Sequence, residues 1–138
     1  MKSHYRAVVI GGGVVGASAL YHLAKMGWND VVLVEKIEYT SGSTWHAAGL
    51  LPLFNMSYSV GKIHKYSVDL YQSLEEETGQ HVSFHKTGNL RLARNQERMD
   101  EYKRYCGTAS TIGVPFEMIG PAEIKKLWPF AKVDDLVG

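Results

Sequence analysis

Three glycines near the start of the chain have a spacing that suits phosphate chemistry. They are Gly11, Gly13 and Gly16, and they follow the short apolar run 7–10. Between a strand and a helix, the first glycine permits a tight turn, the second lets a pyrophosphate reach the backbone, and the third lets the helix lie close to the sheet. The free amide groups and the positive dipole end of the helix then hold the phosphates. The spacing predicts a dinucleotide site.

An acidic residue further along the chain fits the same site. Glu35 follows a second apolar run, 31–34, at a position where a carboxylate can accept both hydroxyls of an adenosine ribose. The same carboxylate would repel a 2′-phosphate, which disfavours NADP. The alternative is a glycine-rich turn beside an ordinary surface acid, and the matching order of strand, turn, helix and acid argues against it. These residues alone do not distinguish FAD from NAD.

The elements that must position these residues follow from the hydrophobic pattern. We expect strands at 7–10 and 31–34, joined by a helix over 14–26 that ends at Gly27. A strand, a helix and a strand in this order form a βαβ unit, in which the two strands are parallel and the crossover is right-handed. The pattern therefore predicts a Rossmann-like α/β unit at the start of the chain.

The rest of the chain is predicted to be more mixed. Apolar spacing indicates a helix over 60–77, and Asn95 can cap another helix that runs to about residue 111. Between them, the alternation over 88–93 predicts a half-exposed strand. Pro121 opens a short fourth helix because proline suits the first helical turn.

These elements suggest two segments and an unfinished fold. We predict a dinucleotide-binding segment over 1–79 and the beginning of a mixed α+β substrate domain over 80–138. Two parallel strands cannot form a stable doubly wound sheet alone, because such sheets are usually wider and covered by helices on both faces. The chain is therefore expected to be the opening part of a larger fold.

Composition limits the other possibilities. The 138 residues are 45% hydrophobic and carry a net charge of +1, so no global field attracts nucleic acid or an anionic membrane. Cys106 is the single cysteine, and His81 and His85 lack an evident third ligand, so neither a disulfide nor a metal site is expected. We expect no secretory signal or organellar leader, and no run approaches the roughly 18 apolar residues of a membrane span. We expect a cytoplasmic location.

The cluster SGSTWHAAG at 41–49 is the most unusual stretch of the sequence. Its hydroxyls and backbone amides suit phosphate contact, and the small residues at 47–49 would let a flat ring approach the main chain. Trp45 could pack on such a ring or fill the core. His46 is either a hydrogen-bonded structural histidine or a reactive imidazole, and local composition alone favours the structural role.

The whole chain resembles the FAD-dependent dimethylglycine and sarcosine dehydrogenases of the D-amino-acid-oxidase-like flavoproteins. The resemblance rests on VVIGGGVVGAS, LVEK, GSTWHAAGL, LEEETGQ and FHKTGNLRLA, with a weaker match at PFEMIGPAEIKKLWP. It implies that FAD is the cofactor and that His46 bonds covalently to its 8α carbon. The letters LLP after Gly49 look more like sarcosine than dimethylglycine dehydrogenases, so the substrate stays open.

The resemblance also implies the reaction and the contacts. Such enzymes oxidise an N-methyl group by hydride transfer to FAD and pass electrons to an electron-transferring flavoprotein. The substrate-facing residues of the family come later than the matched stretch, so no catalytic acid or base is assigned. We expect these cofactor contacts: Gly11, Gly13, Val14, Val15, Gly16, Glu35, Lys36, Ser43, Thr44, His46, Ala48, Gly49 and Leu50.

Two other classes of protein remain open. A nicotinamide-dependent dehydrogenase would use the same glycines and Glu35, but it would leave the cluster at 41–49 unexplained. A non-catalytic remnant or an interaction module is the other class, favoured by the short length. A truncated reading frame or one piece of a split enzyme, with the remainder as a separate chain, would also account for that length. Because the substrate-facing residues of the resembled family come later than the matched stretch, we expect the isolated chain to lack amine-dehydrogenase turnover even if it folds.

Overall fold

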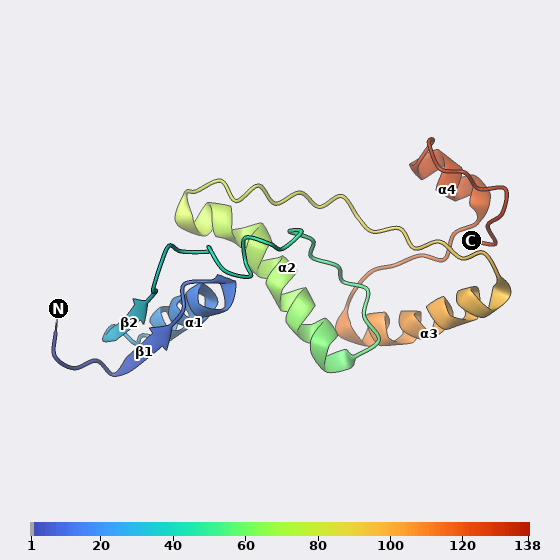
Figure 1. Ribbon diagram of the computed structural model, residues 1–138. Coiled ribbons are helices and arrows are strands. Elements are labelled where there is room, and N and C mark those ends of the chain that lie inside the picture. The colour runs from blue at the N-terminus through green and yellow to red at the C-terminus, as the bar shows by residue number, and fades with distance from the viewer. Residues whose placement is uncertain (1) are drawn as a thin grey trace. The chain divides into compact units, whose positions relative to one another are not determined.

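The computed structural model describes residues 2–138, which form two compact units divided between Leu50 and Leu51. The predicted functional division at Gly79 is a different kind of boundary and stays a prediction. The helices and strands are, in chain order, β1 (Ala7–Ile10), α1 (Val14–Lys25), β2 (Val31–Val34), α2 (Tyr58–Thr78), α3 (Gln96–Ile112) and α4 (Pro121–Leu127) (Figure 1).

The first unit is the predicted βαβ unit. Strands β1 and β2 pair in parallel, with Ala7 opposite Val31 and Ile10 opposite Val34, and α1 packs on both of them. A backbone hydrogen bond of 2.8 Å from Gly11 N to Val34 O continues the pairing into the glycine turn. The β-branched residues of both strands suit this pleated arrangement. The expectation of an incomplete Rossmann-like α/β fold is confirmed.

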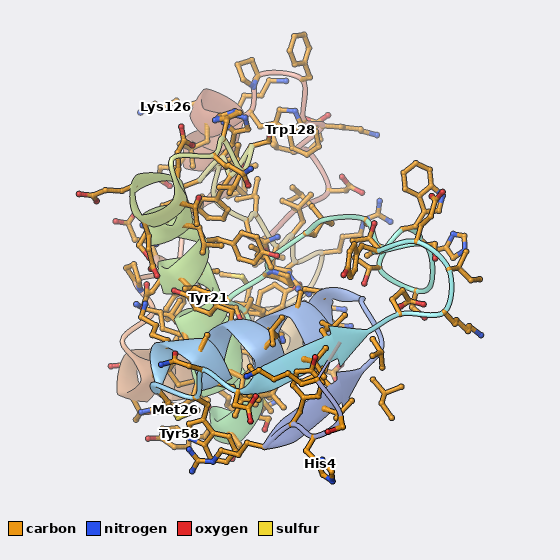
Figure 2. The ribbon with its side chains drawn as sticks, turned by 90° about the vertical axis from the view of Figure 1, so that its left-hand side faces the viewer. His4, Tyr21, Met26, Tyr58, Lys126 and Trp128 are labelled. Carbon is orange, nitrogen blue, oxygen red and sulfur yellow. The ribbon has the colours of Figure 1, made fainter. Side chains whose placement is uncertain are left out.

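This first unit leaves much of its apolar surface uncovered. Ile10 and Val15 are 85% and 80% exposed, and α1 contains no buried residue. Met26, just beyond the end of α1, also projects into solvent (Figure 2). A parallel sheet normally has helices on both faces, and a sheet of two strands with one helix cannot provide that cover.

The second unit contains three helices with clear start and stop signals. The Ser57 hydroxyl accepts a hydrogen bond from Val60 N at the start of α2, and the Asn95 side chain accepts one from Arg98 N at the start of α3. Both helices end at a glycine with positive φ, as is common at helix C-termini. The predicted cap at Asn95 is confirmed.

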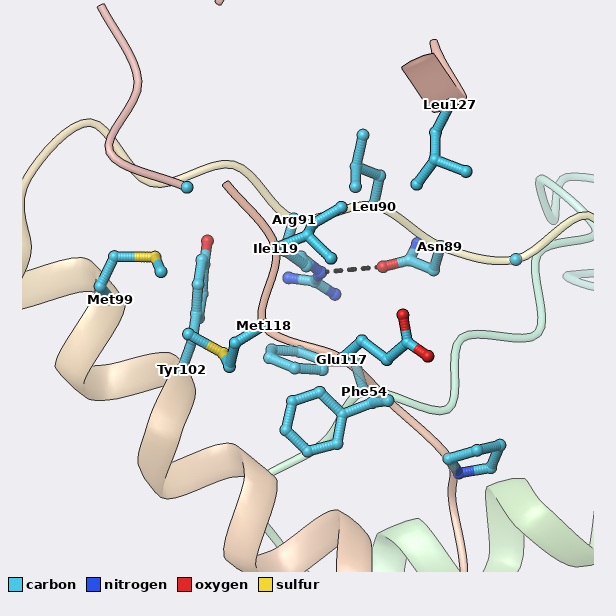
Figure 3. A pocket seen from close by; sticks show the side chains of 14 residues that line it. Phe54, Asn89, Leu90, Arg91, Met99, Tyr102, Glu117, Met118, Ile119 and Leu127 are labelled. Atoms are coloured by element: carbon cyan, nitrogen blue, oxygen red, sulfur yellow. Dashed lines mark hydrogen bonds between the residues drawn. The ribbon is translucent and has the colours of Figure 1, made fainter. Parts of the chain in front are cut away.

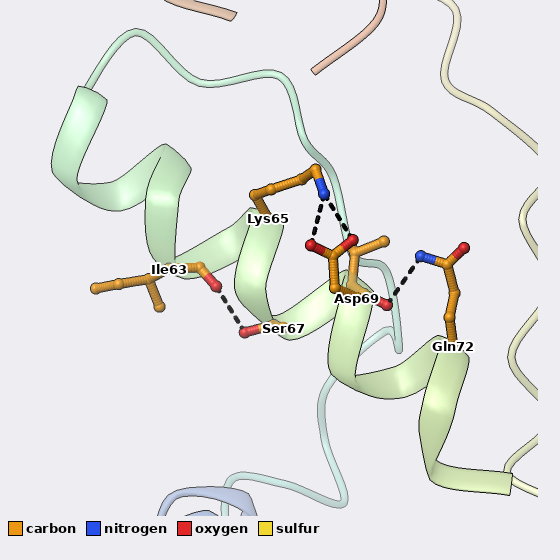
Figure 4. A network of polar contacts seen from close by, with 6 residues as sticks. Ile63, Lys65, Ser67, Asp69 and Gln72 are labelled. Atoms are coloured by element: carbon orange, nitrogen blue, oxygen red, sulfur yellow. Dashed lines mark hydrogen bonds and ion pairs between the residues drawn. The ribbon is translucent and has the colours of Figure 1, made fainter. Parts of the chain in front are cut away.

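Local hydrogen bonds stabilise α2 along its length (Figure 4). Lys65 Nζ contacts both carboxylate oxygens of Asp69, at 2.7 and 2.5 Å, and Ser67 Oγ donates to Ile63 O at 2.8 Å. An exposed ion pair four residues apart stabilises a helix by about 0.3–0.5 kcal/mol. The other stabilisation comes from packing against α3, where buried Gly61 lies beside Ile112.

The strand predicted over 88–93 is wrong. No strand is assigned to these residues, which run as irregular chain between α2 and α3. Within residues 88–93 of the described chain, only Ala93 makes backbone–backbone hydrogen bonds to another segment: its N–H donates to Gly138 O at 2.7 Å and its carbonyl accepts from Val137 N at 2.8 Å. Alternation reports which side chains face inward, but a strand also requires a neighbour, and residues 2–138 offer none to 88–92.

The end of the second unit is organised around α4. Pro121 occupies its first turn, as predicted, and the Glu123 carboxylate accepts a hydrogen bond from Gly120 N at 2.9 Å. Ile124 is fully buried, whereas Trp128, the residue after the helix, is half exposed (Figure 2). None of the helices within residues 2–138 is long and apolar enough to cross a membrane.

Candidate functional site

The glycine turn between β1 and α1 has the geometry that its spacing predicts. Gly11 has a φ of +105°, in a region that residues with side chains rarely adopt. A Cβ atom on Gly16 would lie only 1.8 Å from Gly11 O, so the helix can approach the turn only because residue 16 is glycine. The turn is tight and the helix lies close to it. Contact of these glycines with phosphate stays a prediction.

The start of α1 is capped by a side chain from a loop that is distant in the sequence. Gly13 is the N-cap residue and provides no side chain, but the Thr44 hydroxyl accepts a hydrogen bond from Val14 N at 2.9 Å. A Cβ atom on Gly13 would lie 3.0 Å from the same hydroxyl oxygen. Thr44 therefore lies next to the glycine turn, as it must if Thr44 and the glycines contact the same cofactor.

Glu35 lies directly on the glycine turn. One carboxylate oxygen accepts a hydrogen bond from Gly12 N at 2.6 Å, and the other accepts from Lys36 N at 2.7 Å and Ile37 N at 3.2 Å. These backbone bonds, the one from Gly12 first, lower the pKa of Glu35. The side chain is thus ionised at neutral pH. Because a carboxylate has about four acceptor positions and three are used here, about one remains to accept from a ribose hydroxyl.

Two residues that the sequence did not indicate complete this side of the turn. The Tyr39 ring lies against Gly12, since a Cβ atom there would be 2.4 Å from Tyr39 Cδ1. Thr40 N donates to Gly12 O at 3.0 Å, and Thr40 itself has a φ of +68°. The run of three consecutive glycines was the available signal for Gly12. No sequence signal indicated Tyr39 or Thr40, because their contacts depend on the course of the loop.

The loop that carries His46 is a series of tight turns. Trp45 N donates to Thr40 O at 3.0 Å, and His46 N donates to Ser43 O at 3.2 Å. Trp45 is 76% exposed, so it does not fill a core. The His46 side chain is exposed and makes no hydrogen bond within residues 2–138, in contrast to the hydrogen-bonded structural histidine that local composition favours. It is an accessible imidazole.

The predicted contact residues fall into two groups. Gly11, Gly13, Val14, Gly16, Glu35 and Thr44 surround the glycine turn through the contacts described above. The remaining predicted residues lie in the same unit, but their side chains make no hydrogen bond to the turn: Val15, Lys36, Ser43, His46, Ala48, Gly49 and Leu50.

The second unit contains a separate hollow of about 380 Å³ that the sequence did not indicate (Figure 3). Its wall is mainly apolar, with Tyr102 and Met118 among its residues. The Arg91 guanidinium lies 5.0 Å from the centre of the Phe54 ring and donates to Asn89 Oδ1 at 3.2 Å. Nothing in residues 2–138 gathers three or more side chains able to hold a metal ion.

Comparison with known proteins connects this arrangement to flavoenzymes. The family model "DAO: FAD dependent oxidoreductase" matches residues 6–138. The chain is 47% identical to rat mitochondrial dimethylglycine dehydrogenase, 43% identical to human mitochondrial sarcosine dehydrogenase, and 41% identical to the mouse mitochondrial pyruvate dehydrogenase phosphatase regulatory subunit. These matches cover 99–100% of this chain but only 15–16% of the relatives.

A solved structure agrees with this comparison. L-proline dehydrogenase from P. horikoshii superposes with a TM-score of 0.89 and 31% sequence identity, over 99% of this chain and 36% of that one. The chain thus spans about a sixth of the length of the curated relatives and about a third of that solved chain.

Proposed function

Since the chain belongs to the DAO family of FAD dependent oxidoreductases, we propose that it is the amino-terminal, FAD-binding part of a flavin-dependent amine dehydrogenase. When bound, FAD supplies a ring that accepts a hydride from the substrate. The observation that supports this proposal most strongly is the convergence of Gly16, Glu35 and Thr44 on one glycine turn. A Cβ atom on Gly11 would meet nothing within 4 Å, so the backbone is open at this position of the turn, which fits a dinucleotide.

Different groups at the turn are proposed to bind different parts of the dinucleotide. The Val14 N–H is already bonded to the Thr44 hydroxyl, so the next N–H groups of the first turn of α1, those of Val15 and Gly16, would hold the negative pyrophosphate, with the positive end of the helix dipole behind them. The remaining acceptor position of the Glu35 carboxylate would accept a hydroxyl of the adenosine ribose, and the ionised group would repel a 2′-phosphate. This arrangement favours an adenine dinucleotide without the extra phosphate.

We further propose that His46 is the covalent attachment site. Its imidazole is exposed and makes no hydrogen bond to another side chain in the described residues, so a ring nitrogen is available to bond to the flavin 8α carbon. As this N–C bond forms, an 8α C–H bond and the imidazole N–H bond would break; the two protons and the electron pair would leave a reduced flavin, which dissolved dioxygen would reoxidise. The bond would fix the ring in one orientation. This step depends on the resemblance of the GSTWHAAG cluster to the family motif, and the exposure of His46 supports it.

The substrate and partners proposed here belong to the whole protein. We propose an N-methylated amine such as dimethylglycine or sarcosine as substrate and an electron-transferring flavoprotein as acceptor. The remainder of the enzyme completes the sheet and supplies the catalytic residues, either in the same polypeptide or as a separate chain. The cytoplasmic location is likewise a proposal, and fractionation of cells tests it against the mitochondrial location that the names of several relatives state.

A non-catalytic role is the second candidate function. The similarity to a phosphatase regulatory subunit favours it, because a sequence 41% identical to this chain occurs in a protein named for regulation. Reduction of bound flavin by dimethylglycine or sarcosine, measured in the longest polypeptide that contains this chain, distinguishes the two. Bleaching of the flavin spectrum supports the dehydrogenase, whereas an unchanged spectrum with both amines supports the regulatory role.

Acid precipitation tests the attachment at His46. The wild-type chain is incubated with FAD and precipitated in acid, and the flavin absorbance of the pellet is measured. We expect the colour to stay in the wild-type pellet and in that of a His85→Ala control, whose exposed histidine lies in the other unit. The His46→Ala pellet should be colourless. Colour that washes out of all three pellets contradicts the covalent link.

A further inference from the structure

The cap of α1 comes from the loop that carries His46. Helix caps are usually provided by the N-cap residue itself, but here that residue is Gly13 and has no side chain. The Thr44 hydroxyl, 30 residues from Val14 along the chain, accepts the Val14 N–H instead, at 2.9 Å. A Cβ atom at residue 13 would stand 3.0 Å from that oxygen. A glycine at position 13 therefore also makes room for the hydroxyl.

A second hydrogen bond ties the same loop to the same turn. Thr40 N donates to Gly12 O, and the Thr40 carbonyl then accepts from Trp45 N, both at 3.0 Å. Thr44 is thus held between an anchored backbone at Thr40 and the start of α1. His46 follows only two residues later. The position of its backbone depends on these two attachments.

We propose that Thr44 is a positioning residue: its hydrogen bond with Val14 N, called the clasp below, holds the loop at 41–49 against the start of α1. The clasp thereby sets the position of His46 relative to the dinucleotide site. This inference rests on the proposed function, and it assigns Thr44 a role different from simple phosphate contact. A phosphate ligand would act only when FAD is bound. The clasp is made between protein groups and exists in the FAD-free chain.

Among the described residues, only the Thr44 side chain makes a hydrogen bond to a backbone N–H of the first turn of α1. A single substitution at Thr44 therefore removes the clasp. Valine has nearly the shape of threonine but no acceptor for the Val14 N–H, so Thr44→Val tests the hydroxyl alone. Thr44→Ser keeps the hydroxyl and should therefore behave like the wild type. Ser41→Ala is the matched control, because the Ser41 hydroxyl donates to Glu38 O at 2.8 Å within the loop and does not reach the turn.

The first measurement uses the FAD-free chain. In Thr44→Val we expect hydrogen exchange of the Val14 amide to become about fivefold faster, because the substitution removes one ordinary hydrogen bond. We also expect the NMR order parameters of residues 45–47 to fall from about 0.8 to below about 0.6. Thr44→Ser and Ser41→Ala should match the wild type. Unchanged exchange and order parameters in Thr44→Val would overturn the clasp, and circular dichroism confirms that each variant is folded.

The second measurement adds FAD and compares its affinity with the rate of covalent attachment. Positioning predicts that Thr44→Val slows attachment about tenfold, while the dissociation constant for FAD changes less than about threefold, since only the reacting geometry is lost. Equal losses in both quantities would show simple phosphate contact and contradict the positioning role. If the wild type itself gains no covalent flavin, the attachment at His46 fails, whereas the exchange and relaxation data still decide whether Thr44 holds the loop.

Discussion

The Glu35 carboxylate accepts a hydrogen bond of 2.6 Å from the backbone N–H of Gly12, 23 residues away in the chain. The carboxylate expected to bind the ribose therefore also holds the turn expected to bind the phosphates. Glu35 joins the end of β2 to the turn after β1, in addition to the ladder between the two strands. The ligand recognition proposed for the first unit and its local order would thus depend on the same ionised group.

This bond predicts that the first unit loses stability in acid. The pKa of Glu35 is lowered in the folded chain, chiefly by the Gly12 N–H, from an ordinary value of 4.5. A lowered pKa stabilises the fold fully above that ordinary value, and the contribution disappears as the pH falls through the folded-state pKa. Thermal unfolding between pH 7 and pH 3 should show this loss in the wild type and a smaller loss in Glu35→Gln.

Glu38→Gln is the control for that experiment. It removes an exposed carboxylate of the same loop whose side chain makes no hydrogen bond to the turn within residues 2–138. Its dependence of stability on pH should follow that of the wild type. If Glu35→Gln and Glu38→Gln lose stability in parallel with the wild type, the bond to Gly12 does not contribute as described.

The close approach of α1 to the glycine turn predicts a strong effect at Gly16. In Gly16→Ala the new methyl group would meet the Gly11 carbonyl, a backbone atom that cannot rotate away. Forcing atoms into a filled space costs about 1–3 kcal/mol. Urea denaturation should show this loss of unfolding free energy. Gly42→Ala, where nothing lies within 4 Å, should change stability by less than about 0.5 kcal/mol, and equal effects of the two substitutions would refute the steric argument.

The cap of α3 predicts a moderate effect in the second unit. The Asn95 side chain accepts a hydrogen bond from Arg98 N at 2.9 Å, and removing such a cap costs about 1 kcal/mol. Denaturant unfolding of Asn95→Ala, followed by helical circular dichroism, should show that loss. Asn95→Ser can accept the same bond and should stay close to the wild type. An alanine variant as stable as the serine variant would contradict the importance of the cap.

Local sequence signals predicted the elements well, because each depends on nearby residues. The strands at 7–10 and 31–34 have the predicted bounds, and the helix between them ends one residue earlier than expected, at Lys25. Glycine at a helix end and asparagine at a helix start report local backbone geometry, so these signals are reliable.

The contacts of the candidate site were less predictable, because they join residues distant in the chain. Periodicity says nothing of the bond between Thr44 and Val14, or of the Tyr39 ring against Gly12. The strand expected over 88–93 failed for a related reason, since alternation cannot supply a neighbouring strand. The hollow beside Arg91 likewise arises from segments that meet only in three dimensions.

Parallel calorimetric titrations of the purified chain with FAD, FMN and NADH decide whether the glycine turn is an FAD site. The adenosine and both phosphates of FAD should engage Glu35 and the start of α1, so we predict a single FAD site. FMN lacks the adenosine half, and its affinity should be weaker by at least about tenfold, the equivalent of losing roughly one hydrogen bond to a charged group. NADH should bind more weakly than FAD because it carries no flavin for the loop at 41–49. Tighter binding of NADH, or equal binding of FMN and FAD, would contradict an FAD site at this turn.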